Sequence, residues 1–240
     1  MPAHCDASRV AVVLAITLGL FGCNGAFGER VHETVAQSVA TGAAPRVRVE
    51  NVAGTVRIVG WGKPEAEVIA TKYGYDAQEL RNISVAVRSE PAGVAVVTSY
   101  AAGSQGGGGH QGGVNYRISV PTAASLNVQN TAGAVDVDGI AGDVAVTTEA
   151  GEITASVGRV AGSRAIDLNA TTGAITLTIA GGSSARVEAG STVGNFSSDV
   201  PGVSAVRENV VGSRGSGTIG TGSGRIRLTT TTGAIALRER

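Results

Sequence analysis

The histidines are the first residues to consider for chemistry, because histidine is the side chain most used as a general base and as a metal ligand near neutral pH. They are His4, His32 and His110, and they lie in the leading segment, shortly before the first regular strand pattern, and in a glycine-rich run. None has a serine and an aspartate, or further metal ligands, at a recognisable spacing. We therefore expect lone surface histidines, and a chain without catalytic, cofactor-binding or metal-binding residues.

Carboxylates are the second set of candidates, since a pair of them can hydrolyse a glycosidic bond. Five acidic side chains are predicted on outward strand faces: Asp136, Asp143, Glu152, Asp167 and Glu188. A β-solenoid polysaccharide hydrolase or lyase is therefore the alternative hypothesis. Sugar-cleaving clefts also need aromatic platforms, and aromatic residues make up only 3% of this sequence. We interpret the carboxylates as solvated strand faces that discourage edge pairing.

Two short motifs resemble ion sites without completing them. Asp136-Val-Asp138-Gly139 lacks the downstream acidic ligand of an EF-hand, so outward aspartates on a strand explain it better. The glycines at 106–109 are followed by neither Gly-Lys-Ser/Thr nor the start of a helix, which disfavours phosphate binding there. The formal net charge is zero, and no basic stripe is present for nucleic acid.

The N-terminus has the pattern of a targeting segment. An uncharged apolar run of 12 residues, Val10 to Phe21, follows Arg9. That length suits the core of a signal peptide and is too short for a permanent membrane helix. We assign residues 1–22 to a signal peptide.

The apolar run ends in Leu20-Phe21-Gly22-Cys23, which resembles the bacterial lipoprotein box, although a phenylalanine is unusual at its second place. The resemblance implies lipidation of Cys23. Because Asn24 stands where an inner-membrane retention signal would have aspartate, it also implies an outer-membrane lipoprotein facing the periplasm or the cell surface. The alternative is an ordinary signal peptide, cleaved after Ala26 or Gly28, and a secreted or soluble periplasmic protein.

A glycine recurs at the same place in a short repeated pattern, each time followed two residues later by a bulky apolar residue. The six glycines are Gly54, Gly133, Gly151, Gly173, Gly194 and Gly233. Steps of 18, 22 and 21 residues separate the four from 133 to 194, a period at which each unit buries its apolar face by stacking on its neighbours. Glycine adopts positive φ at no steric cost, so each marks a tight corner.

Period-2 alternation around these corners predicts short strands with one buried face. The predicted inward residues are Val56, Ile58, Val135, Val137, Val144, Ile153, Ile166, Leu168, Ile175, Leu177, Val187, Ile226, Leu228, Ile235 and Leu237. We expect one helical turn over 76–81 and a flexible hairpin loop over 103–113. Residues 23–44 are predicted to be a tether, and 45–240 a single β-repeat domain. Its last rung, 233–237, is expected to leave an open strand edge protected by the charges of 238–240.

The chain resembles the "putative-adhesin" or toastrack domain family of exported bacterial proteins over residues 45–238. Three segments carry the resemblance: Val47 to Trp61, Tyr116 to Pro121, and the Thr-Thr-Gly-Ala-Ile repeats that end at Ile235. It implies an all-β fold, an elongated β-solenoid-like stack of short strands with repeated glycine turns. Membership of this family says little about function, because the family is named for its likeness to adhesins.

Three functions remain open at this point. We favour a non-catalytic, adhesin-like binding module of the cell envelope, anchored to the membrane by lipid at Cys23. Rows of threonine (147–148, 171–172 and 229–232) offer hydrogen bonds to an envelope polymer or a protein partner. The polysaccharide enzyme is one alternative, and an envelope-sensing accessory protein is another. The protein is expected to be mostly monomeric, with weak self-association, and not to bind nucleic acid.

Overall fold

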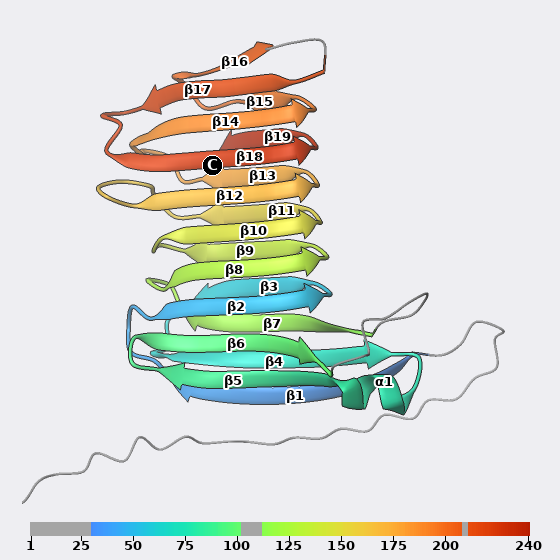
Figure 1. The fold of residues 1–240 in the computed structure, drawn as a ribbon. Helices are drawn as coiled ribbons and strands as arrows, with labels where there is room; N and C mark the ends of the chain where they lie inside the picture. Colours follow the sequence, from blue (N-terminus) through green and yellow to red (C-terminus); the bar gives the residue numbers. More distant parts are fainter. Residues whose placement is uncertain (1–29, 102–111, 208–210) are drawn as a thin grey trace, which may run out of the picture.

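The alternating segments of the sequence form strands in the computed structural model, which describes residues 30–101, 112–207 and 211–240. Figure 1 shows these strands stacked one above another, with one short helix at the end of the stack. The first elements are β1 (Val31–Ala40), β2 (Arg46–Ala53), β3 (Val56–Trp61), β4 (Glu65–Gly74), α1 (Ala77–Asn82), β5 (Ile83–Glu90), β6 (Gly93–Tyr100), β7 (Gly113–Pro121), β8 (Ser125–Ala132) and β9 (Val135–Ile140). The remaining strands are β10 (Val144–Ala150), β11 (Ile153–Val157), β12 (Ala165–Thr172), β13 (Ile175–Ile179), β14 (Ala185–Val193), β15 (Phe196–Ser198), β16 (Val203–Arg207), β17 (Ser213–Ile219), β18 (Gly224–Thr232) and β19 (Ile235–Glu239).

The strands belong to two sheets that lie one behind the other in Figure 1. Sheet A has the order β1-β4-β7-β3-β9-β11-β13-β19-β15, and sheet B has the order β16-β17-β14-β18-β12-β10-β8-β2-β6-β5. Apolar side chains from both sheets are buried in one continuous core. Every inward residue expected from the alternation is buried, with at most 1% of its surface exposed. The predicted all-β, solenoid-like stack is therefore confirmed.

Each rung of the stack consists of a sheet B strand, a glycine corner and a sheet A strand. The rungs are β2/β3, β8/β9, β10/β11, β12/β13, β18/β19 and β14/β15, in their order along the stack. Neighbouring rungs pair in parallel in both sheets. Parallel strands cannot be joined by tight hairpins, so the chain must cross to the other sheet between them.

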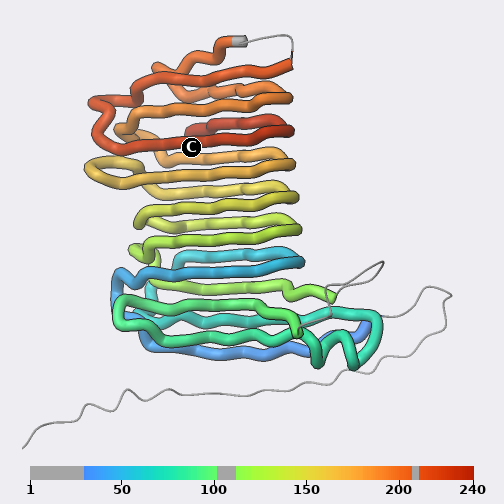
Figure 2. Tube along the Cα trace, viewed as in Figure 1, coloured from blue at the N-terminus to red at the C-terminus, as the bar shows by residue number. Residues whose placement is uncertain are grey.

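The last two strands occupy the interior of both sheets. Strand β18 lies between β12 and β14, and β19 lies between β13 and β15. In Figure 2 the red C-terminal segment therefore lies between segments of the chain that precede it. The expectation that rung 233–237 leaves an open edge is wrong, because β19 is paired on both sides. The outermost strands are β1 and β15 in sheet A, and β16 and β5 in sheet B.

The predicted tether over 23–44 is wrong for the residues that the structure describes. Strand β1 pairs antiparallel with β4 along its whole length, so the β-domain begins at Val31 and not at residue 45. Only Val39 of this strand is buried, because β1 is an edge strand. Its sequence therefore lacks the strong alternation of a strand with a buried face. Lys72 of β4 pairs with Glu33 at 3.4 Å across this edge. Residues 1–29, with the predicted signal peptide and Cys23, lie outside the described residues.

The glycine-rich run does not join a hairpin. Strand β6, before the run, pairs with β2 and β5 in sheet B, whereas β7, after it, pairs with β3 and β4 in sheet A. The prediction of a hairpin over 103–113 is therefore wrong, because the chain changes sheets there. Residues 102–111 of that run lie outside the described residues.

Helix α1 confirms the helical turn expected near residues 76–81. The Asp76 side chain accepts a hydrogen bond from the Glu79 backbone N–H at 2.8 Å, which caps the first turn. Leu80 is the one buried residue of the helix, and it holds α1 at the end of the stack beside β1 and β4. In the part of the chain that the structure describes, no helix is long and apolar enough to cross a membrane.

Candidate binding surface

The glycine corners determine how closely neighbouring rungs of the stack approach each other. Gly173 has φ +151°, and a Cβ atom added there would overlap the backbone carbonyl of Gly151 in the next rung. Four other corners would overlap the carbonyl of a neighbouring corner glycine in the same way, and Gly54 would overlap the Val114 carbonyl of β7. Glycine is required there because the corner carbonyls lie directly against the next corner. The six predicted corner positions are therefore confirmed.

A column of small, inward-facing residues runs beside these corners, three positions before each glycine. Its members are Asn51, Asn130, Thr148, Ala170, Thr230 and Ser191, and all are buried. Thr230 donates to the Gly173 carbonyl at 3.0 Å, and Ser191 to the Gly233 carbonyl at 2.8 Å. These two hydroxyls therefore satisfy their own hydrogen bonding at the corner carbonyls, whereas the buried Thr148 hydroxyl has no partner among the described residues.

One hydrogen-bonded chain joins the two sheets at the other end of this column. The Tyr116 and Thr98 hydroxyls are 2.6 Å apart, and Thr98 donates to the Asn51 side chain at 3.0 Å. Asn51 in turn donates to the Asn130 side-chain oxygen at 3.1 Å. Burial raises the pKa of Tyr116 to about 12, although its hydrogen bond with Thr98 opposes the shift. This network ties sheet A to sheet B, and its Thr98, Asn51 and Asn130 side chains also line a concavity at the surface.

The opposite edge, where the chain returns from sheet A to sheet B, is held by a buried arginine. Arg164 is 8% exposed and donates to the carbonyls of Gly142, Gly158, Arg159 and Ile140 at 2.8–2.9 Å. Burial lowers the pKa of its guanidinium, and the Asp143 carboxylate opposes that shift. Arg164 therefore connects the loops of two neighbouring rungs. Sequence reasoning missed this residue, since nothing local separates it from a surface arginine.

The outer face of sheet B presents a row of neutral polar side chains that cross four strands in register. This amide–hydroxyl strip consists of Gln129, Thr147, Asn169 and Thr229, on β8, β10, β12 and β18. Thr147 and Thr229 are exposed, as the predicted binding rows require, but their neighbours Thr148 and Thr230 are buried in the corner column. The prediction that whole threonine runs face outward is wrong for these two, because alternation turns every second side chain inward.

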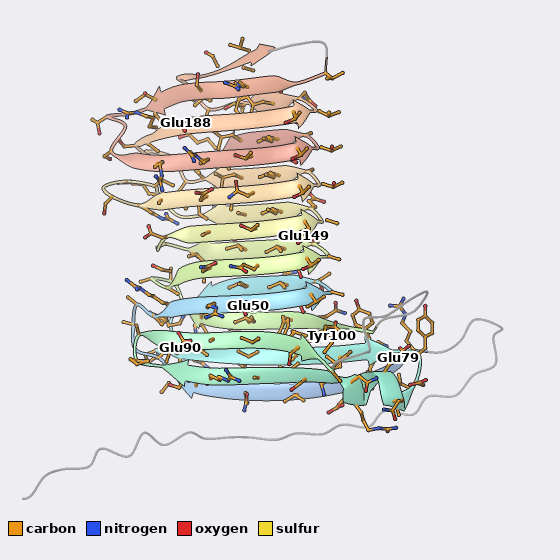
Figure 3. All side chains as sticks on the ribbon, viewed as in Figure 1. Glu50, Glu79, Glu90, Tyr100, Glu149 and Glu188 are labelled. Carbon is orange, nitrogen blue, oxygen red and sulfur yellow. The ribbon has the colours of Figure 1, made fainter. Side chains whose placement is uncertain are left out.

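Two shallow concavities on this face carry opposite charge. One lies on β2, β6, β8 and β10, and Glu50 and Glu149 line it together with Gln129 and Thr147 of the strip. The other lies where β12, β14 and β18 begin, and three arginines and one glutamate, Glu188, line it. Figure 3 views this face and labels Glu50 and Glu188 towards opposite ends of the stack. The outer face of sheet B is therefore acidic near β2 and basic near β14, with the neutral strip between the two.

The five carboxylates of the hydrolase hypothesis do not converge on one site. Asp136 lies on the outer face of sheet A, 3.6 Å from Arg57. Asp143 and Glu152 lie beside the two edges of the stack, between β9 and β10 and between β10 and β11. Asp167 and Glu188 share the outer face of sheet B, but the in-register Arg227 stands between them and pairs with Glu188 at 3.1 Å. The arrangement supports the interpretation as solvated strand faces.

The other predicted sites are placed as follows. His32 is exposed on β1, and Asp136 and Asp138 alternate with buried valines on β9, as expected for an outward strand face. Among residues 30–101, 112–207 and 211–240, no three histidine, cysteine or acidic side chains are grouped as a metal site. His4, His110 and Cys23 lie outside the described residues.

The geometry defines a class of β-stack proteins, and comparison with known proteins places the chain within it. The family model Toastrack DUF4097 matches residues 112–238, which is more than half of the chain. The chain therefore belongs to the Toastrack DUF4097 family. The resemblance expected from the glycine repeats is confirmed.

A solved structure shares this fold at low sequence identity. A "putative cell adhesion protein" from Clostridium sporogenes is 10% identical, with a TM-score of 0.63 over 88% of this chain and 100% of that one. A "putative adhesin" from Bacteroides fragilis is 12% identical, with a TM-score of 0.30 over 86% of this chain and 97% of that one. The first likeness establishes the common fold alone, and the second is too weak to support an argument. No curated protein matches the sequence.

Proposed function

We propose that this protein is a non-catalytic, adhesin-like binding module of the bacterial cell envelope, and that it binds an envelope polymer through the outer face of sheet B. The amide–hydroxyl strip is the observation that carries the proposal. Gln129, Thr147, Asn169 and Thr229 repeat at the strand spacing of about 4.8 Å, so they present donors and acceptors at regular steps along the stack. A polymer with hydroxyl groups along its length fits a regular array better than a small molecule does.

Retention on purified peptidoglycan and on common polysaccharides tests the proposal. The triple variant Gln129→Ala, Thr147→Ala, Thr229→Ala should lose retention, while the folded protein keeps its melting temperature because these side chains are on the surface. The matched control is Thr154→Ala, Thr176→Ala, which removes an in-register threonine pair from the outer face of sheet A. Equal retention of both variants, or release of sugar products by the wild type, would contradict the proposal.

The proposed membrane anchor is a lipid on Cys23. The cysteine ends the apolar run of the leader, and only seven residues separate it from the start of β1 at Val31. At no more than about 3.5 Å per residue, the β1 end of the stack would then stay within roughly 30 Å of the lipid. Labelled fatty acid should enter the wild type and not Cys23→Ser. Absence of label from both would indicate secretion without an anchor.

Localisation at the outer membrane is part of the same proposal. Asn24, next to the anchor cysteine, supports it. Fractionation of cells that produce the wild type should place the protein with outer membranes, and Asn24→Asp should move it towards the inner membrane. A wild-type protein found free in the periplasm or the medium would contradict the anchored location.

A further inference from the structure

The basic concavity at the β14 side of the stack contains two arginines that no carboxylate neutralises. Arg186 on β14 and Arg225 on β18 are in register on adjacent parallel strands, and both side chains are exposed on the outer face of sheet B. They line the same concavity with Arg227 and Glu188, and Ser163 adds a hydroxyl group from the loop before β12. The site is assembled from three strands and two loops, the second being the loop before β18.

The charges of this concavity do not balance. Glu188 pairs with Arg227 at 3.1 Å, with each side chain more than half exposed. Within the described part of the chain, Arg186 and Arg225 have no ion-pair partner. Like charges on directly opposite residues of neighbouring strands repel each other, so the pair costs stability when the site is empty. An anion placed between the two guanidiniums would remove that repulsion.

The shape of the guanidinium group indicates what kind of anion fits. Arginine presents a rigid fork of N–H donors that matches the paired oxygens of a carboxylate or phosphate. Thr229 follows Arg227 at the next outward position of β18 and belongs to the amide–hydroxyl strip. One ligand can therefore place an anionic group at the arginines while its hydroxyl groups lie along the strip.

We propose that Arg186 and Arg225 bind the anionic groups of an acidic polysaccharide that lies along the outer face of sheet B. This inference rests on the proposed function and adds the chemical class of its ligand. Glu50 and Glu149, beside Gln129 and Thr147 at the other end of the strip, would repel an anionic group there, which confines the anion contact to the basic concavity.

The experiment compares binding of polygalacturonate, a uronate polymer, with binding of neutral dextran by the whole protein. Arg186→Gln, Arg225→Gln should weaken polygalacturonate binding at least about tenfold, because two charge-assisted contacts are lost. The matched control is Arg48→Gln on β2, an exposed arginine of the same face that is neutralised by Glu50. Both variants should melt cooperatively, and raised salt should weaken binding by the wild type and the control.

Different outcomes separate this inference from the proposed function. Equal affinity of the two variants for polygalacturonate, or tighter binding to dextran than to polygalacturonate, would overturn the inference while leaving a polysaccharide-binding module in place. Binding of inorganic phosphate or of anionic lipid vesicles at the arginines, without binding of any polymer, would overturn the inference and the proposed function together.

Discussion

At the scale of single residues, the most informative side chain is one that faces no ligand. Arg164 gives its donors to four backbone carbonyls and is almost fully buried. Arg164→Met would keep most of the apolar stem and leave those carbonyls without their donors. We expect a loss of about 3 kcal/mol in unfolding free energy, since each hydrogen bond to a charged group contributes roughly 1.5–3 kcal/mol and water will replace part of them.

Thermal denaturation checks this expectation. A loss of that size should lower the melting temperature by roughly 10 °C in a domain of this length. Arg159→Met is the matched control, because Arg159 is an exposed arginine of the same loop and contributes only its backbone carbonyl to Arg164. A similar small effect of both substitutions would show that water readily replaces the guanidinium.

Tyr116 makes stability depend on pH in the alkaline range. Its pKa is raised to about 12 by burial, from an unperturbed value of about 10. Between those values the unfolded chain releases the phenolic proton and the folded chain keeps it. The contribution is therefore fully present below pH 10 and is lost as the pH rises to 12, at up to about 1.4 kcal/mol per pH unit.

Urea denaturation at pH 8, 10 and 11.5 measures this loss. The wild type should become less stable over the upper interval, with Tyr100 adding to the effect because its pKa is also raised to about 12 by burial. Tyr116→Phe should be less stable at pH 8, where it lacks the bond to Thr98, and should lose less between pH 10 and 11.5. Parallel curves for the two proteins would contradict the assignment to Tyr116.

Sequence alone predicted the direction of side chains well and their interactions poorly. The inward residues were correct because alternation fixes which face a side chain occupies. Arg186 and Arg225 were missed as a pair, since 38 residues separate them and their register is unknown until the order of the strands is known. The Tyr116 network was missed for the same reason, because its partners Thr98 and Asn51 come from different strands.

At the scale of elements, the glycine corner is the feature that a substitution tests best. Gly173→Ala would place a methyl group against the Gly151 carbonyl at a φ of +151°. Overlap with backbone cannot be relieved by a side-chain rotation, so the whole corner must move. We expect a cost of about 3 kcal/mol or more, in the range of strained-backbone substitutions.

Gly190→Ala is the control for this substitution. Gly190 lies in β14 with no atom within 4 Å of the added methyl group and without a positive φ. It should be neutral within about 0.5 kcal/mol. Chemical denaturation of both variants decides the point: equal stability would show that the corners can rearrange.

The boundaries of elements were predicted correctly for interior strands, which pair with a strand on each side and bury every second side chain. The corners and the strands β8 to β13 follow the expected pattern for that reason. β1 was taken for a tether because an edge strand with one buried residue carries little apolar signal. The order of the rungs could not be predicted from the sequence either. The segments around Gly173 and Gly233 have nearly the same sequence, so the pattern does not show which rung packs against which.

At the scale of the whole molecule, the interior position of β18 and β19 predicts a severe effect of truncation. Deleting residues 224–240 removes Ile226, Leu228, Ile235 and Leu237, which are almost fully buried. At about 2–3 kcal/mol for each buried side chain, the loss is comparable to the whole stability of an ordinary domain. We therefore expect no cooperative unfolding transition for the truncated chain.

Deletion of β1 is the matched control for this truncation. Residues 31–40 form an edge strand with only Val39 buried, so their loss should lower the melting temperature and preserve a cooperative transition. Circular dichroism during heating distinguishes the two proteins. A cooperative transition in the protein without 224–240 would mean that β14 and β15 can close directly onto β12 and β13.

The interior position of β18 and β19 also affects the order in which the stack can form during synthesis. These strands follow all the others in the sequence, so the rungs β12/β13 and β14/β15 each lack a neighbour while the ribosome is still making the chain. Domains usually fold as units once their sequence is available. Here the stack between β12/β13 and β14/β15 is incomplete until β18 and β19 emerge. For a protein with the proposed signal peptide, that order would leave this end of the stack unfolded, in a form that an export channel can thread, until late in synthesis.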